Sequence, residues 1–298
     1  MSHESRTPEA RRLQSRQLVL VIALSVGTLL VEVAGGLLSG SLALLSDAGH
    51  VLTDLLALVL SLMAVRFASL PATPAKSYGY HRLEILTALL NGALLVAMSA
   101  AILYKATRRF FAPVPIESRL MMAVALAGLL ANLAGIILLS RAPQNLNLRG
   151  ARMHVVGDAL SSVGVLVAGG IIALTGWARL DSIVGGAIAV VIAVGSLRLV
   201  REAVDVLLEA TPAGIDLDLV SRVIATVPGV VEVHDLHIWS ITTGLPALSG
   251  HVRLDGSETQ TSDEMLNRIK QTVHDRFGIV HTTIQIETRG YQELGEVH

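Results

Sequence analysis

Long apolar segments separated by short polar ones occupy the first two thirds of the chain. A helix needs about 20 residues to cross the hydrocarbon core of a bilayer, and six of these segments are near that length. We therefore predict six transmembrane helices, at residues 18–38, 42–65, 83–104, 120–139, 154–174 and 183–200. The sixth helix is expected to continue through residues 201–210.

Residues 1–17 are polar, and no small-residue cleavage site closes the long apolar run after them, so we interpret that run as a spanning helix rather than a signal peptide. Lys and Arg favour cytoplasmic loops. The N-terminal tail and the loops after the second and fourth predicted helices hold ten of them, against five in the other three loops. We therefore expect both termini in the cytoplasm, with a tail at 1–17, a transmembrane domain at 18–208 and a cytoplasmic domain at 209–298.

The pattern changes after about residue 212, where short amphipathic segments replace the long apolar ones. It predicts a helix, two strands, a helix and a strand, at residues 217–227, 230–242, 246–255, 262–277 and 281–287. Ser262 is the expected N-cap of the second helix, in which Met265, Ile269, Val273 and Phe277 recur at helical spacing. This order of elements fits a small α+β domain of ferredoxin-like type.

The composition agrees with a polytopic α-helical membrane protein, since 52% of the residues are hydrophobic and 16% are charged. The chain contains no Cys, which excludes a disulfide framework and a thiolate metal site. Aromatic residues make up 3%, and no block of basic residues occurs, which argues against a nucleic-acid partner. A soft metal ion would have to be held by His, carboxylate or Met side chains.

Two short stretches place ionisable groups inside predicted spans. Asp47, His50 and Asp54 in "SDAGHVLTD" are spaced i, i+3, i+7 and share one helical face. His154 and Asp158 in "HVVGD" repeat the i, i+4 pair. An unpaired Asp in mid-bilayer costs about 2.5–3.5 kcal/mol, and a divalent cation would compensate both pairs. Two imidazoles and two carboxylates form a tetrahedral set that Zn²⁺ favours.

A single intramembrane His or Asp is more often a hydrogen-bonding group between helices than a metal ligand. The repetition of one pair in two separate spans favours the metal site here. Asp47 lies one turn nearer the extracytoplasmic end, and we expect it to help solvate a water-filled cavity rather than to bind the ion. Glu32 is a further acidic residue inside the first predicted span.

The stretches "SLALLSDAGHVLTD", "HVVGDALSSVGV", "DLHIWSIT" and "HTTIQIE" resemble the cation diffusion facilitator family, in particular its bacterial zinc, cadmium and cobalt efflux members. The resemblance covers nearly the whole chain. It implies six transmembrane helices followed by a cytoplasmic ferredoxin-like domain, a homodimer, and a bacterial inner membrane. It also implies that His50, Asp54, His154 and Asp158 form the transport site, and the two-His, two-Asp set resembles that of zinc-selective members.

The resemblance implies further roles outside the spans. His234, His251 and Glu287 match positions that bind regulatory zinc, and His281 matches a ligand that reaches toward the loop holding His81. Arg82 and Glu209 match a charge pair that interlocks the two protomers; the alternative is an ordinary solvated pair. From strand alternation alone, we expect His234 and His237 on opposite faces, and therefore not in one site.

Metal binding needs neutral His and ionised Asp, so it competes with protons. The prediction is a proton-coupled Zn²⁺ efflux transporter working by alternating access, and no nucleotide-binding motif suggests another energy source. Cd²⁺, Co²⁺ and Ni²⁺ remain open as cargo because affinity orders overlap. The alternatives are a membrane metalloenzyme, which the absence of H-E-x-x-H disfavours, and a metal-sensing membrane protein, which would need only two spans. An exporter of organic cations is disfavoured by the few aromatic residues.

Overall fold

The computed structural model describes residues 8–68, 70–140, 146–255 and 261–288, without the side chains of some residues within the helices. The chain divides into two compact units. The membrane unit comprises residues up to 60 together with 90–200, and the sheet unit comprises residues 61–89 together with those from 201 onward.

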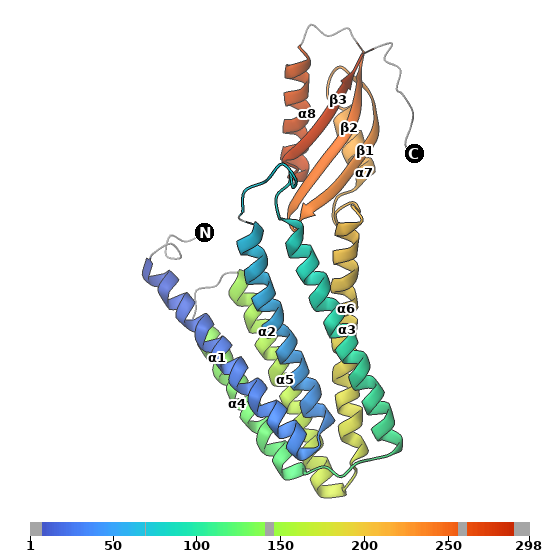
Figure 1. Ribbon diagram of the computed structural model, residues 1–298. Coiled ribbons are helices and arrows are strands. Elements are labelled where there is room, and N and C mark those ends of the chain that lie inside the picture. The colour runs from blue at the N-terminus through green and yellow to red at the C-terminus, as the bar shows by residue number, and fades with distance from the viewer. Residues whose placement is uncertain (1–7, 69, 141–145, 256–260, 289–298) are drawn as a thin grey trace. The chain divides into compact units, whose positions relative to one another are not determined.

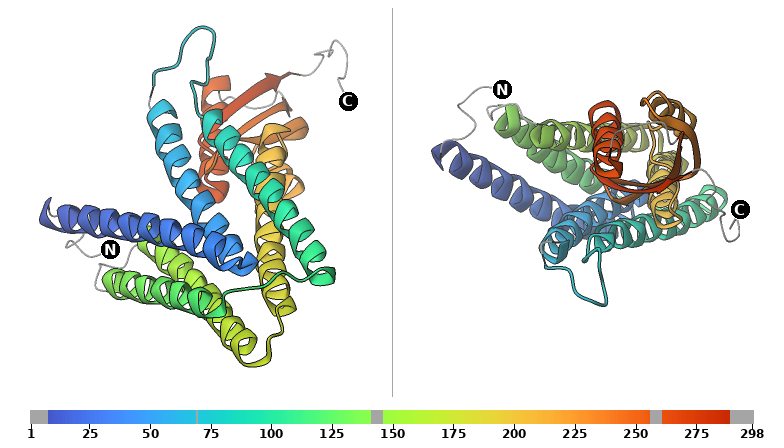
Figure 2. Two further views of the ribbon diagram at one scale, coloured as in Figure 1. Left: turned by 60° about the horizontal axis from the view of Figure 1, so that its bottom comes forward. Right: turned by 90° about the horizontal axis from the view of Figure 1, so that it is seen from above.

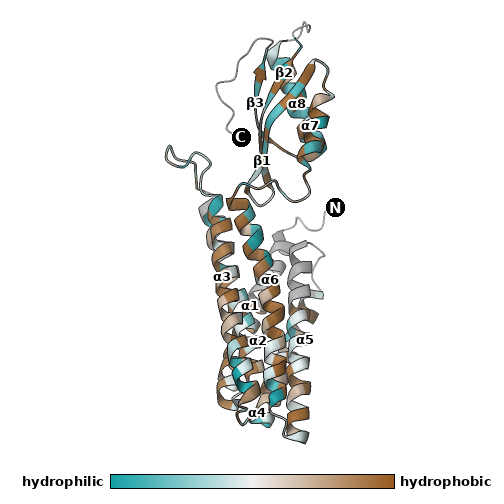
Figure 3. Ribbon diagram, turned by 90° about the vertical axis from the view of Figure 1, so that its right-hand side faces the viewer, coloured by the Kyte–Doolittle hydropathy of each residue, from teal (hydrophilic) through white to brown (hydrophobic). Residues whose placement is uncertain are grey.

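Six long helices follow one another from the N-terminus (Figure 1). They are α1 (Pro8–Ser39), α2 (Leu42–Ala68), α3 (Arg82–Phe111), α4 (Ser118–Ser140), α5 (Leu146–Thr175) and α6 (Arg179–Leu207). Each predicted span lies within one of them. Five contain a described stretch that is long and apolar enough to cross a membrane, and α2 is the sixth span. Apolar residues predominate along these helices (Figure 3), and the six-helix prediction is confirmed.

The α6 helix ends at Leu207, three residues before the predicted end. Glu209 adopts a left-handed conformation with φ of 59°, and the N–H of Ala210 donates to the carbonyl of Asp205. This geometry closes a helix, although Gly is the usual residue at the left-handed position. Pro212 follows shortly after and also opposes continuation of the helix.

Small residues let the helices of the membrane unit approach closely. A Cβ on Gly35 of α1 would lie 2.4 Å from Val124 Cγ2 of α4, and one on Gly169 of α5 would lie 2.7 Å from Met122 Cγ of α4. Buried Leu44, Met121 and Val165 join α2, α4 and α5 in one core cluster. Figure 2 shows α1, α4 and α5 side by side. Such contacts replace the hydrophobic effect as the source of helix association in lipid.

A buried carboxylate from α6 caps the first turn of α2. Asp181 accepts hydrogen bonds from the N–H of Leu42 at 2.7 Å, the N–H of Ala43 at 3.1 Å and the Ser41 hydroxyl at 2.6 Å. The Ser41 hydroxyl in turn accepts from the N–H of Leu44 at 3.1 Å. The orphan N–H groups that every helix start presents are thus satisfied across two helices.

Replacing Asp181 by Ala is expected to lower the free energy of unfolding by about 3 kcal/mol, since hydrogen bonds to a charged group are lost and buried N–H groups stay unmatched. Equilibrium unfolding in mixed detergent micelles would measure the change. The Asp181→Asn variant keeps an acceptor oxygen and should lose less. Equal stability of the Ala variant and the parent would contradict this role.

The sheet unit contains α7 (Leu217–Ala225), β1 (Val230–Thr242), β2 (Leu245–Leu254), α8 (Ser262–Phe277) and β3 (His281–Glu287). The order β1-β2-β3 has an antiparallel first pair and a parallel second pair. Side chains of α7 and α8 pack with those of the sheet in one core, among them Ile224, Leu248 and Ile269. The predicted α-β-β-α-β order and the ferredoxin-like class are confirmed.

The N-cap of α8 differs from the predicted one by one residue. The N-cap is Thr261 and not Ser262, because Glu264 stands three residues after Thr261 and completes a capping box. The Thr261 hydroxyl accepts from the N–H of Glu264, and the Glu264 carboxylate accepts from the N–H of Thr261. Met265, Ile269 and Val273 are buried as predicted, and Phe277 packs against the same core.

Candidate metal sites

The structure brings together three of the predicted intramembrane ligands. His50 and Asp54 lie one turn apart on α2, with Nδ1 of His50 3.5 Å from Oδ2 of Asp54. Nε2 of the same imidazole lies 3.9 Å from Oδ1 of Asp158 on α5. The imidazole therefore stands between two carboxylates, one ring nitrogen facing each. The side chain of His154, the fourth predicted ligand, lies outside the described residues.

Two further acids of the membrane unit are buried. Asp47 is 2% exposed and Glu32 is 1% exposed. Oδ1 of Asp47 and Oε2 of Glu32 have no hydrogen-bond partner among the described residues. Glu32 was not among the candidate site residues from sequence, although the signal was present: an acidic residue in the middle of an apolar segment is costly unless it has a function.

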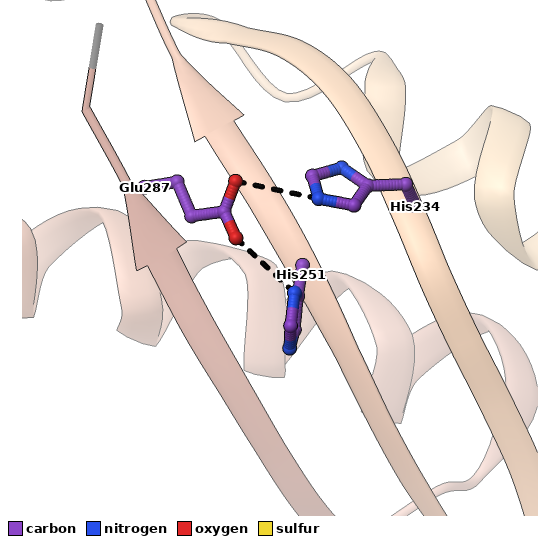
Figure 4. A group of neighbouring side chains, drawn as sticks. All are labelled: His234, His251 and Glu287. Atoms are coloured by element: carbon purple, nitrogen blue, oxygen red, sulfur yellow. Dashed lines mark ion pairs between the residues drawn. The ribbon is translucent and has the colours of Figure 1, made fainter. Parts of the chain in front are cut away.

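The sheet unit holds a compact group of ligand-type side chains, one from each strand (Figure 4). Nε2 of His234 lies 3.3 Å from Oε2 of Glu287, and Nδ1 of His251 lies 3.1 Å from Oε1. Candidate ligand atoms of the three residues all lie within 4.8 Å of one another, and no other group of three His, Asp or Glu among the described residues is so close. Glu287 is 1% exposed, so its charge needs compensation.

A β-bulge decides which histidines share this face of the sheet. His234 pairs with His251, whereas His237 pairs with Ser249, so β1 has one more residue than β2 over this stretch. Asp235 takes the extra position with φ of 47°. Ser249 and His251 are two residues apart and face the same side, so His234 and His237 do too. The expectation of opposite faces was wrong, because the bulge breaks the alternation.

The bulge also places Asp235 beside the group of three. Oδ1 of Asp235 accepts a hydrogen bond from His237 at 2.9 Å, and Oδ2 lies 3.7 Å from Nε2 of His251. The bond from His237 holds the pKa of Asp235 below its ordinary value. Nη2 of Arg253 lies 3.7 Å from Oε2 of Glu287 and supplies a positive charge to the buried carboxylate.

His281 does not join this group. It lies at the start of β3, six residues before Glu287, and lines a cavity of about 370 Å³ that His81 also lines. Its ring meets that of Tyr78 edge to face, with centroids 5.6 Å apart. The structure thus places His281 with His81 and apart from His234 and His251.

Arg82 and Glu209 meet within one chain. Nη2 of Arg82 donates to Oε1 of Glu209 at 2.8 Å, and the side chains are 43% and 59% exposed. The residues that the resemblance pairs between protomers are therefore also direct partners within a protomer.

A six-helix membrane bundle with clustered His and Asp side chains, joined to an α+β domain with a second His and Glu cluster, defines an integral membrane transporter of metal cations. The chain matches the cation efflux transmembrane domain over residues 18–208 and the cation efflux protein cytoplasmic domain over residues 212–289. It belongs to the cation efflux, or cation diffusion facilitator, family. It is a transporter and not an enzyme, which removes the metalloenzyme alternative.

Similar proteins cover nearly the whole chain. The zinc transporter ZitB of Shigella flexneri is 40% identical over 276 residues, which are 92% of this chain and 87% of that protein. The cadmium, cobalt and zinc/H(+)-K(+) antiporter of Bacillus subtilis (strain 168) is 38% identical over 278 residues, 92% of this chain and 89% of that protein. A solved structure of the metal-bound C-terminal domain of the CzcD transporter from Cupriavidus metallidurans is 43% identical and covers 24% of this chain and 99% of that one, with a TM-score of 0.22.

Proposed function

We propose that this protein exports Zn²⁺ from the cytoplasm in exchange for protons by alternating access. The observation that carries the proposal is the meeting of His50, Asp54 and Asp158 between two membrane helices. The two relatives, named as a zinc transporter and as a cadmium, cobalt and zinc/H(+)-K(+) antiporter, support both the cargo and the coupling. His154, one turn before Asp158 on α5, is the fourth proposed ligand.

The chemistry of this donor set supplies the coupling. In the structure each ring nitrogen of His50 faces a carboxylate oxygen, one from α2 and one from α5. An entering Zn²⁺ requires a neutral imidazole and ionised carboxylates, and it therefore displaces protons. When the site faces the more acidic side, protons compete for the same groups and release the metal. Four protein ligands leave no position for a catalytic water, as expected of a carrier site.

We further propose a topology with both termini in the cytoplasm, in the inner membrane of a bacterium. The tail would end near residue 17, and the cytoplasmic domain would begin near residue 209. The protein would act as a homodimer, in which Arg82 and Glu209 exchange partners between protomers. Reversing each charge singly should weaken dimerisation in detergent, and the double reversal should restore it. Loss of dimer in the double variant as well would exclude this role.

His234, His251 and Glu287 are proposed to bind a regulatory Zn²⁺. His81 and His281 line one cavity and are proposed as a weaker ligand pair. The zinc content of purified full-length protein would test the pair. Substitution of both His81 and His281 by Ala should lower that content, and an unchanged content would exclude them.

Transport by purified protein in liposomes would test the main proposal. With an acidic lumen, Zn²⁺ should accumulate as protons leave, and a protonophore should stop the accumulation. Parallel assays with Cd²⁺, Co²⁺, Ni²⁺ and Mg²⁺ would define the selectivity, and Mg²⁺ should be excluded because it prefers oxygen ligands and retains water. Zinc uptake that ignores the pH gradient would refute proton coupling.

A further inference from the structure

Glu32 of α1 is a buried acid that the proposed transport site does not use. It lies in the middle of an apolar helix and is 1% exposed. Its Oε2 atom has no hydrogen-bond partner among the described residues. An acidic side chain inside a membrane helix is energetically costly, and Oε2 of Glu32 gains no hydrogen bond from the described residues to offset that cost. This carboxyl group is therefore a candidate for a ligand-binding role.

The carboxyl group occupies a niche between three helices. A Cβ added to Gly128 of α4 would lie 2.9 Å from Oε1 of Glu32, 3.5 Å from Oγ of Ser162 on α5 and 3.7 Å from Cγ2 of Thr28 on α1. A side chain at position 128 would therefore force the flexible end of Glu32 to shift. The missing side chain of Gly128 leaves room for the Glu32 carboxyl group on the side of α4 where Ser162 of α5 also lies.

This niche lies next to the transport site. Ser162 follows Asp158 by four residues on α5, so the two share one helical face about one turn apart. Glu32 interacts electrostatically with Asp158 of α5 and Asp47 of α2, and Asp47 also interacts with Asp158 and His50. Among the residues that the structure describes, these are the titratable groups that act on Glu32 from neighbouring helices, and α4 contributes Gly128. Burying several carboxylates in one region of the membrane unit is costly unless cations or protons balance their charge.

We propose that Glu32 is a proton-binding group of the transporter, coupled through space to the metal site. The inference rests on the proposed Zn²⁺/H⁺ exchange and adds a titrating group outside the ligand set. Zn²⁺ in the site attracts the ionised form of Glu32, so metal binding releases its proton to water. Protonation of Glu32 removes one negative charge from the neighbourhood of the metal and so favours metal release. The coupling is reciprocal, as thermodynamic linkage requires.

Zinc binding to detergent-solubilised full-length protein tests the proposal. A His251→Ala background removes the cytoplasmic group, and calorimetry in buffers of different ionisation enthalpy counts the protons released per zinc bound. Glu32→Gln has nearly the same shape but cannot ionise. It should release about one proton fewer, and its apparent zinc affinity should be about tenfold weaker at alkaline pH and equal to the parent at acidic pH. Glu32→Asp should restore much of the release.

Glu117→Gln is the matched control, because it makes the same chemical change at an exposed position and should release as many protons as the parent. Gly128→Ala keeps the Glu32 carboxyl group but displaces it from its niche, and should shift the pH dependence of zinc binding. An unchanged proton count in a folded Glu32→Gln protein would overturn the inference. If the parent itself neither released protons nor transported zinc, the proposed function would fail instead.

Discussion

Zinc accumulation by proteoliposomes is expected to fall to the level of protein-free liposomes when Asp158 is replaced by Ala. Asp158 is the carboxylate that α5 brings to the imidazole of His50, at 3.9 Å, and it is 7% exposed. Its loss removes a ligand and half of the negative charge that the proposed site offers to the ion. Loss of a direct ligand should weaken metal binding by at least about 100-fold. Initial rates of zinc uptake with an acidic lumen would measure the effect.

The transport result has to be separated from a folding defect. Asp158→Ala protein should elute as the parent does on size exclusion and reach the same yield in the membrane, since Asp158 lies within α5 and at neither of its ends. Asp218→Ala, an exposed acid on α7, is the matched control and should transport normally. Parental uptake by the Asp158→Ala protein would show that the site has been placed wrongly.

Removal of Glu287 is expected to eliminate high-affinity zinc binding by the sheet unit. This carboxylate contacts both His234, at 3.3 Å, and His251, at 3.1 Å. Without it, two imidazoles remain, and a bis-imidazole pair holds zinc far more weakly. Glu287→Ala should lower zinc affinity by about 100-fold or more. Isothermal titration of full-length protein carrying both Asp54→Ala and His81→Ala would isolate this site.

Glu232→Ala provides the control for that titration. Glu232 is exposed and forms an ion pair with Arg253, so its removal changes the charge nearby without touching the group of three. The zinc affinity of the Glu232→Ala protein should stay close to that of the parent. Equal binding by the Glu287→Ala protein and the parent would mean that zinc binds elsewhere in the sheet unit.

The membrane helices were predictable because apolar length alone identifies them in a bilayer. The ends of these helices were harder to predict. The α6 helix ends at Leu207 because the backbone of Glu209 adopts a left-handed conformation, which is unusual for a residue other than Gly. The order of helices and strands along the sheet unit followed from the alternation of strand and helix patterns. The N-cap of α8 was misplaced by one residue because both Thr261 and Ser262 are good capping residues, and only the partner Glu264 distinguishes them.

The candidate sites were found in sequence where one helix carries both members of a pair, as with His50 and Asp54. Sites assembled from residues of different strands were harder to predict from the sequence. The resemblance named His234, His251 and Glu287, but spacing alone could not place them together, and simple alternation misplaced His237. Asp235 fills the bulge and Gly250 of β2 leaves room for Leu236, whose Cδ1 atom would lie 2.8 Å from a Cβ at that position. Asp235 and Gly250 thus help to set the face that the histidines occupy.

The carboxylate of Asp181 has a mechanical consequence for the helix that presents His50 and Asp54. With three hydrogen bonds at its first turn, α2 is anchored at that end, and backbone atoms of Leu42 and Ala43 lie only 3.1 Å from where a Cβ on Gly185 would be. Sliding α2 along its axis would break all three bonds, whereas swinging it about this anchor would break none. We therefore expect the alternation between open faces to be a lever motion, with the largest displacement far from residue 42.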